Sequence, residues 1–241
     1  MDIMTRTLQG SEEKVGGIWG VVTHPAHARK GIFRTLMHKS HEYFADKSYK
    51  FSILNTSKSL IAYALYQKLG YRDAIIYRGV YKVIKDTKKT TEKRGKKTRM
   101  DWNKILEIYN QATQDKTGFV VKDTQYGKML ETRKRIQPKN CIVTNKGYAL
   151  LKEDSGNVAV QEIIALTKDE ISKLITHSES EATKTVIAEA VLNNNLQKAY
   201  LSSGFMIFQD SYDLLMSKPL AKASFKEVYG NKFYAAATDY F

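Results

Sequence analysis

Apolar residues in the first third of the chain recur at two spacings, one typical of strands and one typical of helices. Mainly apolar runs at 16–22, 50–55 and 75–83 predict three strands. Residues 31–46 and 57–69 carry apolar side chains three and four positions apart, which predicts two amphipathic helices. The order strand, helix, strand, helix, strand predicts an α/β fold with an at least partly parallel sheet packed between helices.

The second of these helices has a one-sided pattern. Tyr63 and Tyr66 fall toward the side opposite its apolar stripe, and Gly70 follows as a helix stop. We therefore expect the stripe to be buried and the two tyrosines to face away from it. The stripe comprises Leu60, Ile61, Ala64, Leu65 and Leu69.

A second set of elements follows from about residue 100. Asp101 is the expected N-cap of a helix that starts at Trp102, and Thr167 with Glu170 forms a capping box before another helix. Turn residues at 145–147 and 153–156 make three neighbouring strands a meander. We expect further helices at 124–136, 168–178 and 194–203, and strands at 140–144, 148–152, 157–166, 183–191 and 206–217.

A basic run separates these two halves. Residues 85–99, KDTKKTTEKRGKKTR, contain eight basic and two acidic residues and no large apolar side chain, within a chain of net charge +14. That composition predicts a solvated linker, which could also touch RNA, DNA or an acidic surface. The expected organisation is a first domain at 1–84, the linker at 85–99, a second domain at 100–220 and an aromatic tail at 221–241.

The composition is that of an intracellular globular protein. The 241 residues suffice for one large or two modest domains, and they contain neither an apolar run of transmembrane length nor a signal-peptide pattern. The single cysteine, Cys141, excludes an internal disulfide framework and is expected to be a structural strand residue. We therefore expect a cytoplasmic protein without membrane contact.

Residues 21–37, VVTHPAHARKGIFRTLM, combine a strand, a tight turn and a helix start. Exposed amides at a helix N-terminus beside Arg29 and Lys30 form a site for a diphosphate, and Gly31 lets a phosphate approach the backbone. The run resembles the acetyl-coenzyme A motif of the GNAT N-acetyltransferase superfamily, and residues 25–37 are similar to its enhanced-intracellular-survival (Eis) subgroup. It departs from the superfamily pattern at Ala28 and Phe33, and an ordinary strand-turn-helix is the alternative.

This resemblance implies a set of cofactor-binding residues. Backbone amides at the strand end would hold the pantetheine arm and polarise the thioester carbonyl, and the turn would bind the diphosphate. The strand-end residues are Val21, Val22 and Thr23, and the turn residues are Arg29, Lys30, Gly31 and Ile32.

A second motif lies on the helix that ends at Gly70. The run 62–71, AYALYQKLGY, resembles the GNAT pattern in which a tyrosine protonates the leaving thiolate, which implies that role for Tyr66. A phenol can serve as such an acid because it keeps its proton at neutral pH. The alternative for Tyr66 is a packed ring with a hydrated hydroxyl.

The two halves are similar to a degenerate tandem repeat of GNAT domains. The pattern 65–71 recurs at 199–205, but the second copy has Asp169 and Glu170 at the helix N-terminus, which would repel a diphosphate. The first copy is shortened, because only about fifteen residues precede its phosphate-binding strand where the family has additional helices and strands. Another part of this chain or a second copy, in a homo-oligomer, could supply the missing sheet.

The aromatic tail and a pair of histidines are two further candidate sites. The tail carries Phe225, Tyr229, Phe233 and Tyr234, and the Eis resemblance implies that the terminal Phe241 carboxylate acts as the general base; surface packing of the tail is the alternative. His38 and His41, three positions apart, lack the carboxylate or cysteine partners of a metal site, so we expect no metal. His24 is expected to fill the turn before Pro25.

The predicted function is acetyl-CoA-dependent N-acetyl transfer to a primary amine by direct attack. The acceptor class stays open among small-molecule amines, protein lysines and protein N-termini. The alternatives are a catalytically inactive acyl-CoA-binding or assembly module, for which Ala28 and Phe33 argue, and a nucleic-acid-binding protein that uses the linker.

Overall fold

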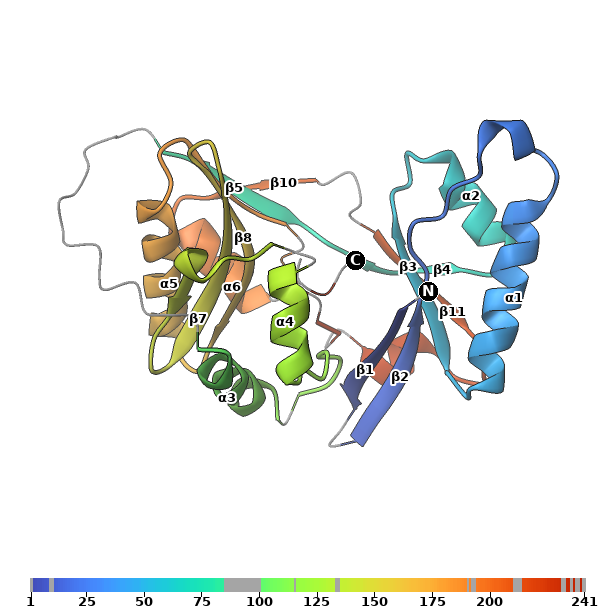
Figure 1. Cartoon of the computed structure of the whole chain (residues 1–241), viewed down its shortest axis with the longest axis horizontal. Coiled ribbons are helices and arrows are strands. Elements are labelled where there is room, and N and C mark those ends of the chain that lie inside the picture. The colour runs from blue at the N-terminus through green and yellow to red at the C-terminus, as the bar shows by residue number, and fades with distance from the viewer. Residues whose placement is uncertain are drawn as a thin grey trace.

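The chain forms two sheet-containing lobes that lie side by side (Figure 1). The computed structural model describes residues 2–8, 11–84, 101–114, 116–132, 135–189, 191, 194–209, 214–230, 233–234, 236 and 239. Within this part of the chain, one sheet has the strand order β1-β2-β3-β11-β4 and the other the order β10-β5-β9-β8-β7-β6. The mixed α/β architecture agrees with the sequence prediction.

The first sheet begins with a hairpin that the sequence analysis missed. Strand β1 (Asp2–Leu8) pairs antiparallel with β2 (Ser11–Gly17), and β2 runs parallel to β3 (Phe51–Thr56). The expected strand at 16–22 was therefore misplaced, because the ladder ends at Gly17. Backbone pairing with β1 holds the polar sequence of β2 in the sheet, and polar residues gave no apolar signal.

Two predicted strands are each divided between the two sheets. The expected strand at 75–83 is β4 (Arg72–Ile76) in the first sheet and β5 (Gly79–Val83) in the second. The expected strand at 206–217 is likewise β10 (Met206–Phe208) in the second sheet and β11 (Leu214–Pro219) in the first. Strand β11 pairs antiparallel with both β3 and β4, so a late part of the chain completes the early sheet.

The inserted strand β11 is buried on both faces. Leu214 and Met216 pack in the core that includes Phe44 of α1 (Ile32–Asp46) and Tyr66 of α2 (Ile61–Lys68). Leu215 points to the opposite core, which contains Phe225 and the other aromatic residues of α7 (Phe225–Tyr229). This burial makes β11 an integral part of the first sheet.

The second sheet carries helices on both faces, largely as predicted. Strands β6 (Cys141–Val143), β7 (Gly147–Asp154) and β8 (Asn157–Ala165) form the expected meander, and β9 (Thr185–Ala188) runs parallel to β8. Asp101 caps α3 by accepting hydrogen bonds from the amides of Asn103 and Lys104. The helices are α3 (Trp102–Thr113), α4 (Thr124–Thr132), α5 (Lys168–Ser180) and α6 (Asn194–Ser202), with short 3₁₀ turns η1 (Pro25–His27) and η2 (Pro138–Asn140).

The aromatic tail packs into the cores of both sheets. Phe233 is buried with Phe225 beside the first sheet, whereas the next residue, Tyr234, lies in the core under α3 and α4 of the second. The Tyr234 ring stacks on Phe119 with centroids 4.4 Å apart and planes at 10°. The tail thus joins the two lobes as a buried element.

Candidate functional site

The chain leaves the first sheet immediately after β2. The Ile18 amide still donates to the Ile53 carbonyl at 2.9 Å, but the following residues run outside the ladder. Val21 is 41% and Val22 87% exposed, and Thr23 is half-buried. These three predicted cofactor-binding residues therefore lie in an exposed extended segment and not in the buried strand that the sequence predicted.

A tight turn connects this segment to α1. The Ala26 amide donates to Nδ1 of His24 at 3.2 Å, so His24 caps η1 as expected from its place before Pro25. Arg29 and Gly31 both have left-handed backbone conformations, with φ of 62° and 76°. A Cβ placed on Gly31 would meet nothing within 4 Å, so the space in front of the helix is open there. The glycine is needed for its backbone conformation, which other residues adopt only with strain.

The two helices that follow parallel strands differ at their N-termini. No side chain caps α1, its first turn carries no acidic residue, and exposed Arg29 and Lys30 stand just before it. In α5, Thr167 accepts a hydrogen bond from the Glu170 amide at 3.3 Å, and the first turn is acidic. The predicted Thr167 cap is thus confirmed, whereas the Glu170 carboxylate accepts a hydrogen bond from the Thr144 hydroxyl at 2.6 Å. Of these two helices, α1 is the one suited to an anion.

Tyr66 faces the core and not away from it. Tyr66 is 7% exposed, and its ring centroid lies 5.9 Å from that of Phe33 and 6.0 Å from that of Tyr71. The predicted apolar stripe of α2 was wrong, since Ile61 is 88% exposed and only Leu69 of that set is buried. Tyr66 and Leu69 are buried instead, with half-buried Ala62 packed against the same core, because the larger aromatic surface removes more apolar area from water.

A chain of polar side chains lies behind Tyr66, and the sequence analysis did not find it. Lys218 lies 3.3 Å from Nδ1 of His41, whose Nε2 is 2.9 Å from the Tyr71 hydroxyl, which in turn is 2.7 Å from Oγ of Ser52. An ammonium can only donate, so His41 accepts at Nδ1 and donates from Nε2 to the Tyr71 hydroxyl. The hydroxyls of Tyr71 and Ser52 share the next hydrogen bond. These residues come from β11, α1, β3 and the turn before β4, whose meeting was not visible from sequence.

The environment of His41 lowers its basicity. Burial, the positive charge of Lys218 and then His38 lower the pKa of His41 to about 4. Both ring nitrogens are engaged by Lys218 and Tyr71, and the described residues contain no group of three or more potential metal-ligating side chains. His41 is therefore a neutral member of a hydrogen-bond chain at neutral pH.

Of three other sequence candidates, the structure places Cys141, which begins β6. Burial, with a smaller effect from Glu131, raises the pKa of the Cys141 thiol to about 12, so it stays protonated at neutral pH. Phe241 and the basic run 85–99 lie outside the described residues, so the terminal carboxylate and nucleic-acid contact remain sequence predictions.

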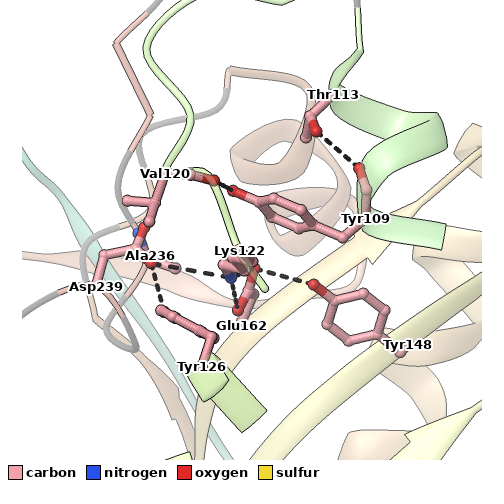
Figure 2. Close-up of polar contacts among 9 residues, drawn as sticks. All are labelled: Tyr109, Thr113, Val120, Lys122, Tyr126, Tyr148, Glu162, Ala236 and Asp239. Carbon is pink, nitrogen blue, oxygen red and sulfur yellow. Dashed lines mark hydrogen bonds and ion pairs between the residues drawn. The ribbon is translucent and has the colours of Figure 1, made fainter. Parts of the chain in front are cut away.

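A buried charged cluster in the second lobe also escaped the sequence analysis (Figure 2). Lys122 donates to both carboxylate oxygens of Glu162 at 2.6 and 2.7 Å, and Asp239 from the tail lies 3.8 Å from the same ammonium. Each of the three side chains is at most 3% exposed. One feature of the sequence could have indicated this cluster, namely a glutamate within the apolar run of β8. A carboxylate buried there needs a charged partner elsewhere in the chain.

One protein-family model matches the first part of the chain. The model described as "Acetyltransferase (GNAT) domain" matches residues 3–74. No curated protein matches the chain. Within the described residues, none of the helices has the length and apolar character needed to cross a membrane.

Solved structures share the fold at low sequence identity. A GCN5-related N-acetyltransferase from Kribbella flavida is 18% identical with a TM-score of 0.60, over 90% of this chain and 56% of its own. One from Anabaena variabilis is 13% identical with a TM-score of 0.60, over 91% and 58%. Eis1 from Mycobacterium abscessus is 16% identical with a TM-score of 0.58, over 91% and 61%.

The chain thus spans 56–61% of the length of these three solved structures. Their likeness extends over nearly all of the present chain and therefore concerns both lobes. Residues 3–74 match a GNAT acetyltransferase domain, and the chain as a whole has a GNAT-like fold of mixed sheets flanked by helices.

Proposed function

We propose that this chain is an acetyl-CoA-dependent N-acetyltransferase that acts on a primary amine by direct attack. The supporting observation is the N-terminus of α1, which has no side-chain cap and is preceded by exposed Arg29 and Lys30 and the left-handed Gly31. Amides of Gly31 and Ile32 with these two side chains would bind the diphosphate. Acetyl-CoA would supply the activated acetyl group as a thioester.

The exposed segment after β2 would orient the acetyl group. The amides of Val21, Val22 and Thr23 would hold the pantetheine arm and polarise the thioester carbonyl. Exposure of Val22, in the segment that follows the parallel strand β2, supports this role, because a ligand must reach the backbone there.

Tyr66 would donate the proton to the departing thiolate. A phenol ordinarily keeps its proton at neutral pH, and the Phe33 and Tyr71 rings restrict the side chain. The hydrogen-bond chain through His41 and Tyr71 would hold the end of α2 in place.

The Phe241 carboxylate would accept a proton from the acceptor ammonium, directly or through water. Asp239, two positions earlier, is buried and hydrogen bonded, which fixes the chain close to its end. Two residues span at most about 7 Å, so the acceptor amine would have to bind near Asp239.

We also propose an Eis-like tandem arrangement, with the first domain at 1–84, the linker at 85–99, the second domain at 100–220 and the tail at 221–241. The two domains would exchange strands, because β5 lies in the second sheet and β11 in the first. The same succession of a parallel strand pair with two helices in both lobes supports it. The capped, acidic start of α5 argues that the second domain binds no coenzyme A.

The deciding experiment is calorimetric titration with acetyl-CoA of the wild type, Gly31→Asp and Gly31→Asn. Aspartate and asparagine are similar in size and both tolerate a left-handed backbone, so the pair differs mainly in charge. We expect stoichiometric binding by the wild type, retention in Gly31→Asn and at least tenfold weaker binding in Gly31→Asp, from about 1.4 kcal/mol of repulsion. Absence of binding by all three proteins would refute the proposed site.

An inactive acyl-CoA-binding module is the second candidate. The packing of Phe33 on Tyr66 favours it, because a residue larger than the family pattern narrows the space beside the proposed acid. Tight acetyl-CoA binding without acetyl transfer to any of a panel of polyamines, aminoglycosides and lysine peptides would support this module over the enzyme.

A further inference from the structure

The two lobes contain the same local geometry, a pair of parallel strands that separate after a few residues. In the first lobe, β2 and β3 are paired at Gly16↔Ser52 and Gly17↔Ile53 and then part. In the second, β8 and β9 are paired from Asn157↔Thr185 to Val160↔Ala188, after which β8 continues beside β7 alone. We call the space beyond the last pair the split of each lobe.

The two splits differ in what covers them. Beyond the last pair of the first lobe, the residues 19–22 are exposed. Beyond the last pair of the second lobe, Glu162, Ile163 and Ile164 are 3–8% exposed. The second split retains a cavity of about 20 Å³, which holds one water at most.

The C-terminal tail is what fills the second split. Tyr234 and Ala236 line the remaining cavity together with Val160 and Ala188 of the diverging strands and Tyr200 of α6. Tyr234 is held from its other side by the stacked ring of Phe119. An inserted chain segment therefore closes the opening in the sheet.

Asp239 fastens this segment through contacts with side chains of the second lobe (Figure 2). Its Oδ1 accepts a hydrogen bond from the Tyr126 hydroxyl at 2.7 Å and lies 3.8 Å from the Lys122 ammonium. Its Oδ2 accepts one from the Ala236 amide at 3.0 Å, which closes a turn within the tail.

Lys122 and Glu162 form a pair that does not need the tail for its charge balance. The Tyr148 hydroxyl donates to Glu162 at 3.1 Å, and the Lys122 ammonium lies 4.2 and 4.7 Å from the centroids of the Tyr109 and Tyr126 rings. Asp239 adds a second buried carboxylate to this pair. A buried carboxylate is tolerated only where hydrogen-bond donors and a cation contact it. Because Lys122 and Tyr126 provide these contacts, the site favours a carboxylate at position 239 of the tail.

We propose that the second split is a built-in receptor for Tyr234, Ala236 and Asp239 of the chain's own tail, with Lys122 and Tyr126 as the recognition site for Asp239. The tail occupies the position that corresponds to the open split of the first lobe. The second lobe is thereby closed to any extended ligand that would enter between β8 and β9, whether or not the first lobe binds acetyl-CoA.

The test is hydrogen exchange measured by mass spectrometry on the full chain, comparing Tyr126→Phe with Tyr148→Phe. Each variant removes one hydroxyl from the cluster, and of these two hydroxyls that of Tyr126 donates to Asp239 and that of Tyr148 to Glu162. A lost hydrogen bond to a charged group should raise exchange in the peptide 233–241 by about tenfold or more in Tyr126→Phe. Exchange in the β7 peptide of the same protein serves as the reference for general loosening of the lobe.

Asp239→Asn keeps the size of the side chain and provides the second arm. We expect it to speed tail exchange on its own, and we expect Tyr126→Phe to add less than about threefold in its presence, because the two changes remove one interaction. Equal effects of Tyr126→Phe and Tyr148→Phe on the tail would overturn the proposal. So would tail exchange that tracks the β7 reference in every variant, since the tail would then open only with the whole lobe.

Discussion

The hydrogen-bond chain through His41 should make the first lobe sensitive to acid. Its imidazole is 6% exposed and has a pKa of about 4 in the folded chain against an ordinary value of 6.5. Between these values the unfolded chain binds a proton that the folded chain does not. The stabilisation is therefore fully present above pH 6.5 and is lost as the pH falls toward 4.

The size of this effect follows from the interval between the two pKa values. At about pH 5 the imidazole of the unfolded chain is almost fully protonated, because this pH lies about 1.5 units below its ordinary pKa. Each unit corresponds to about 1.36 kcal/mol of unfolding free energy. This gives an upper value of about 2 kcal/mol, and solvent screening around the partly exposed Lys218 reduces it to about 1–2 kcal/mol. Protonated His41 would also have to direct an Nδ1 hydrogen at the Lys218 ammonium, which explains the sign.

The assay is urea denaturation followed by circular dichroism at about pH 7.5 and about pH 5, on the wild type and on His41→Gln. Glutamine can accept from Lys218 and donate to Tyr71 but does not titrate. The free energy of unfolding should fall by about 1–2 kcal/mol more in the wild type than in the variant between the two pH values. Equal losses in the two proteins would refute this account of His41.

Two further predictions concern the proposed chemistry. Tyr66→Phe should lower turnover by about 10²-fold or more in a thiol-release assay while the acetyl-CoA dissociation constant changes less than about threefold. The reason is that a general acid contributes to the chemical step and not to binding. Equal losses of turnover and of acetyl-CoA affinity would assign Tyr66 a packing role beside Phe33 and Tyr71. Deletion of Phe241 should lower turnover and remove the acidic limb of the pH profile, where protonation of the base stops the reaction, without changing acetyl-CoA affinity. Unchanged turnover would exclude the terminal carboxylate as the base.

Local signals predicted most individual elements. The meander from β6 to β8, the Asp101 and Thr167 caps and the start of α1 all depend on residues near each other in sequence. These interactions are formed by the segment itself, so the segment's sequence is sufficient to indicate them.

The errors concern interactions between distant segments. The polar strand β2 is a strand because β1 pairs with it, and the buried face of α2 was decided by the partners of Tyr66 on α1 and β11. Two short runs were read as single strands because nothing in 75–83 or 206–217 marks the point where the chain changes sheets.

The sequence motifs of the candidate site were predicted, but the side chains that surround them were not. The turn from Arg29 to Gly31 and the place of Tyr66 on a helix followed from sequence, whereas the Lys218–His41–Tyr71 chain and the Asp239 contacts join residues far apart in the chain. Without an indication that β11 and the tail return to earlier elements, no local pattern could bring those residues together.

The position of β11 has a consequence for how the protein is made. Residues 214–219 pair with residues 51–56 and 72–76, so about 140 residues or more must be synthesised after β4 before the first sheet can be closed. Until then β3 and β4 have unpaired edges and the apolar side chains of that core lack a cover, a state prone to aggregation. The lobe that carries the candidate site can therefore mature only after all the strands of the other sheet, β5 to β10, have been synthesised.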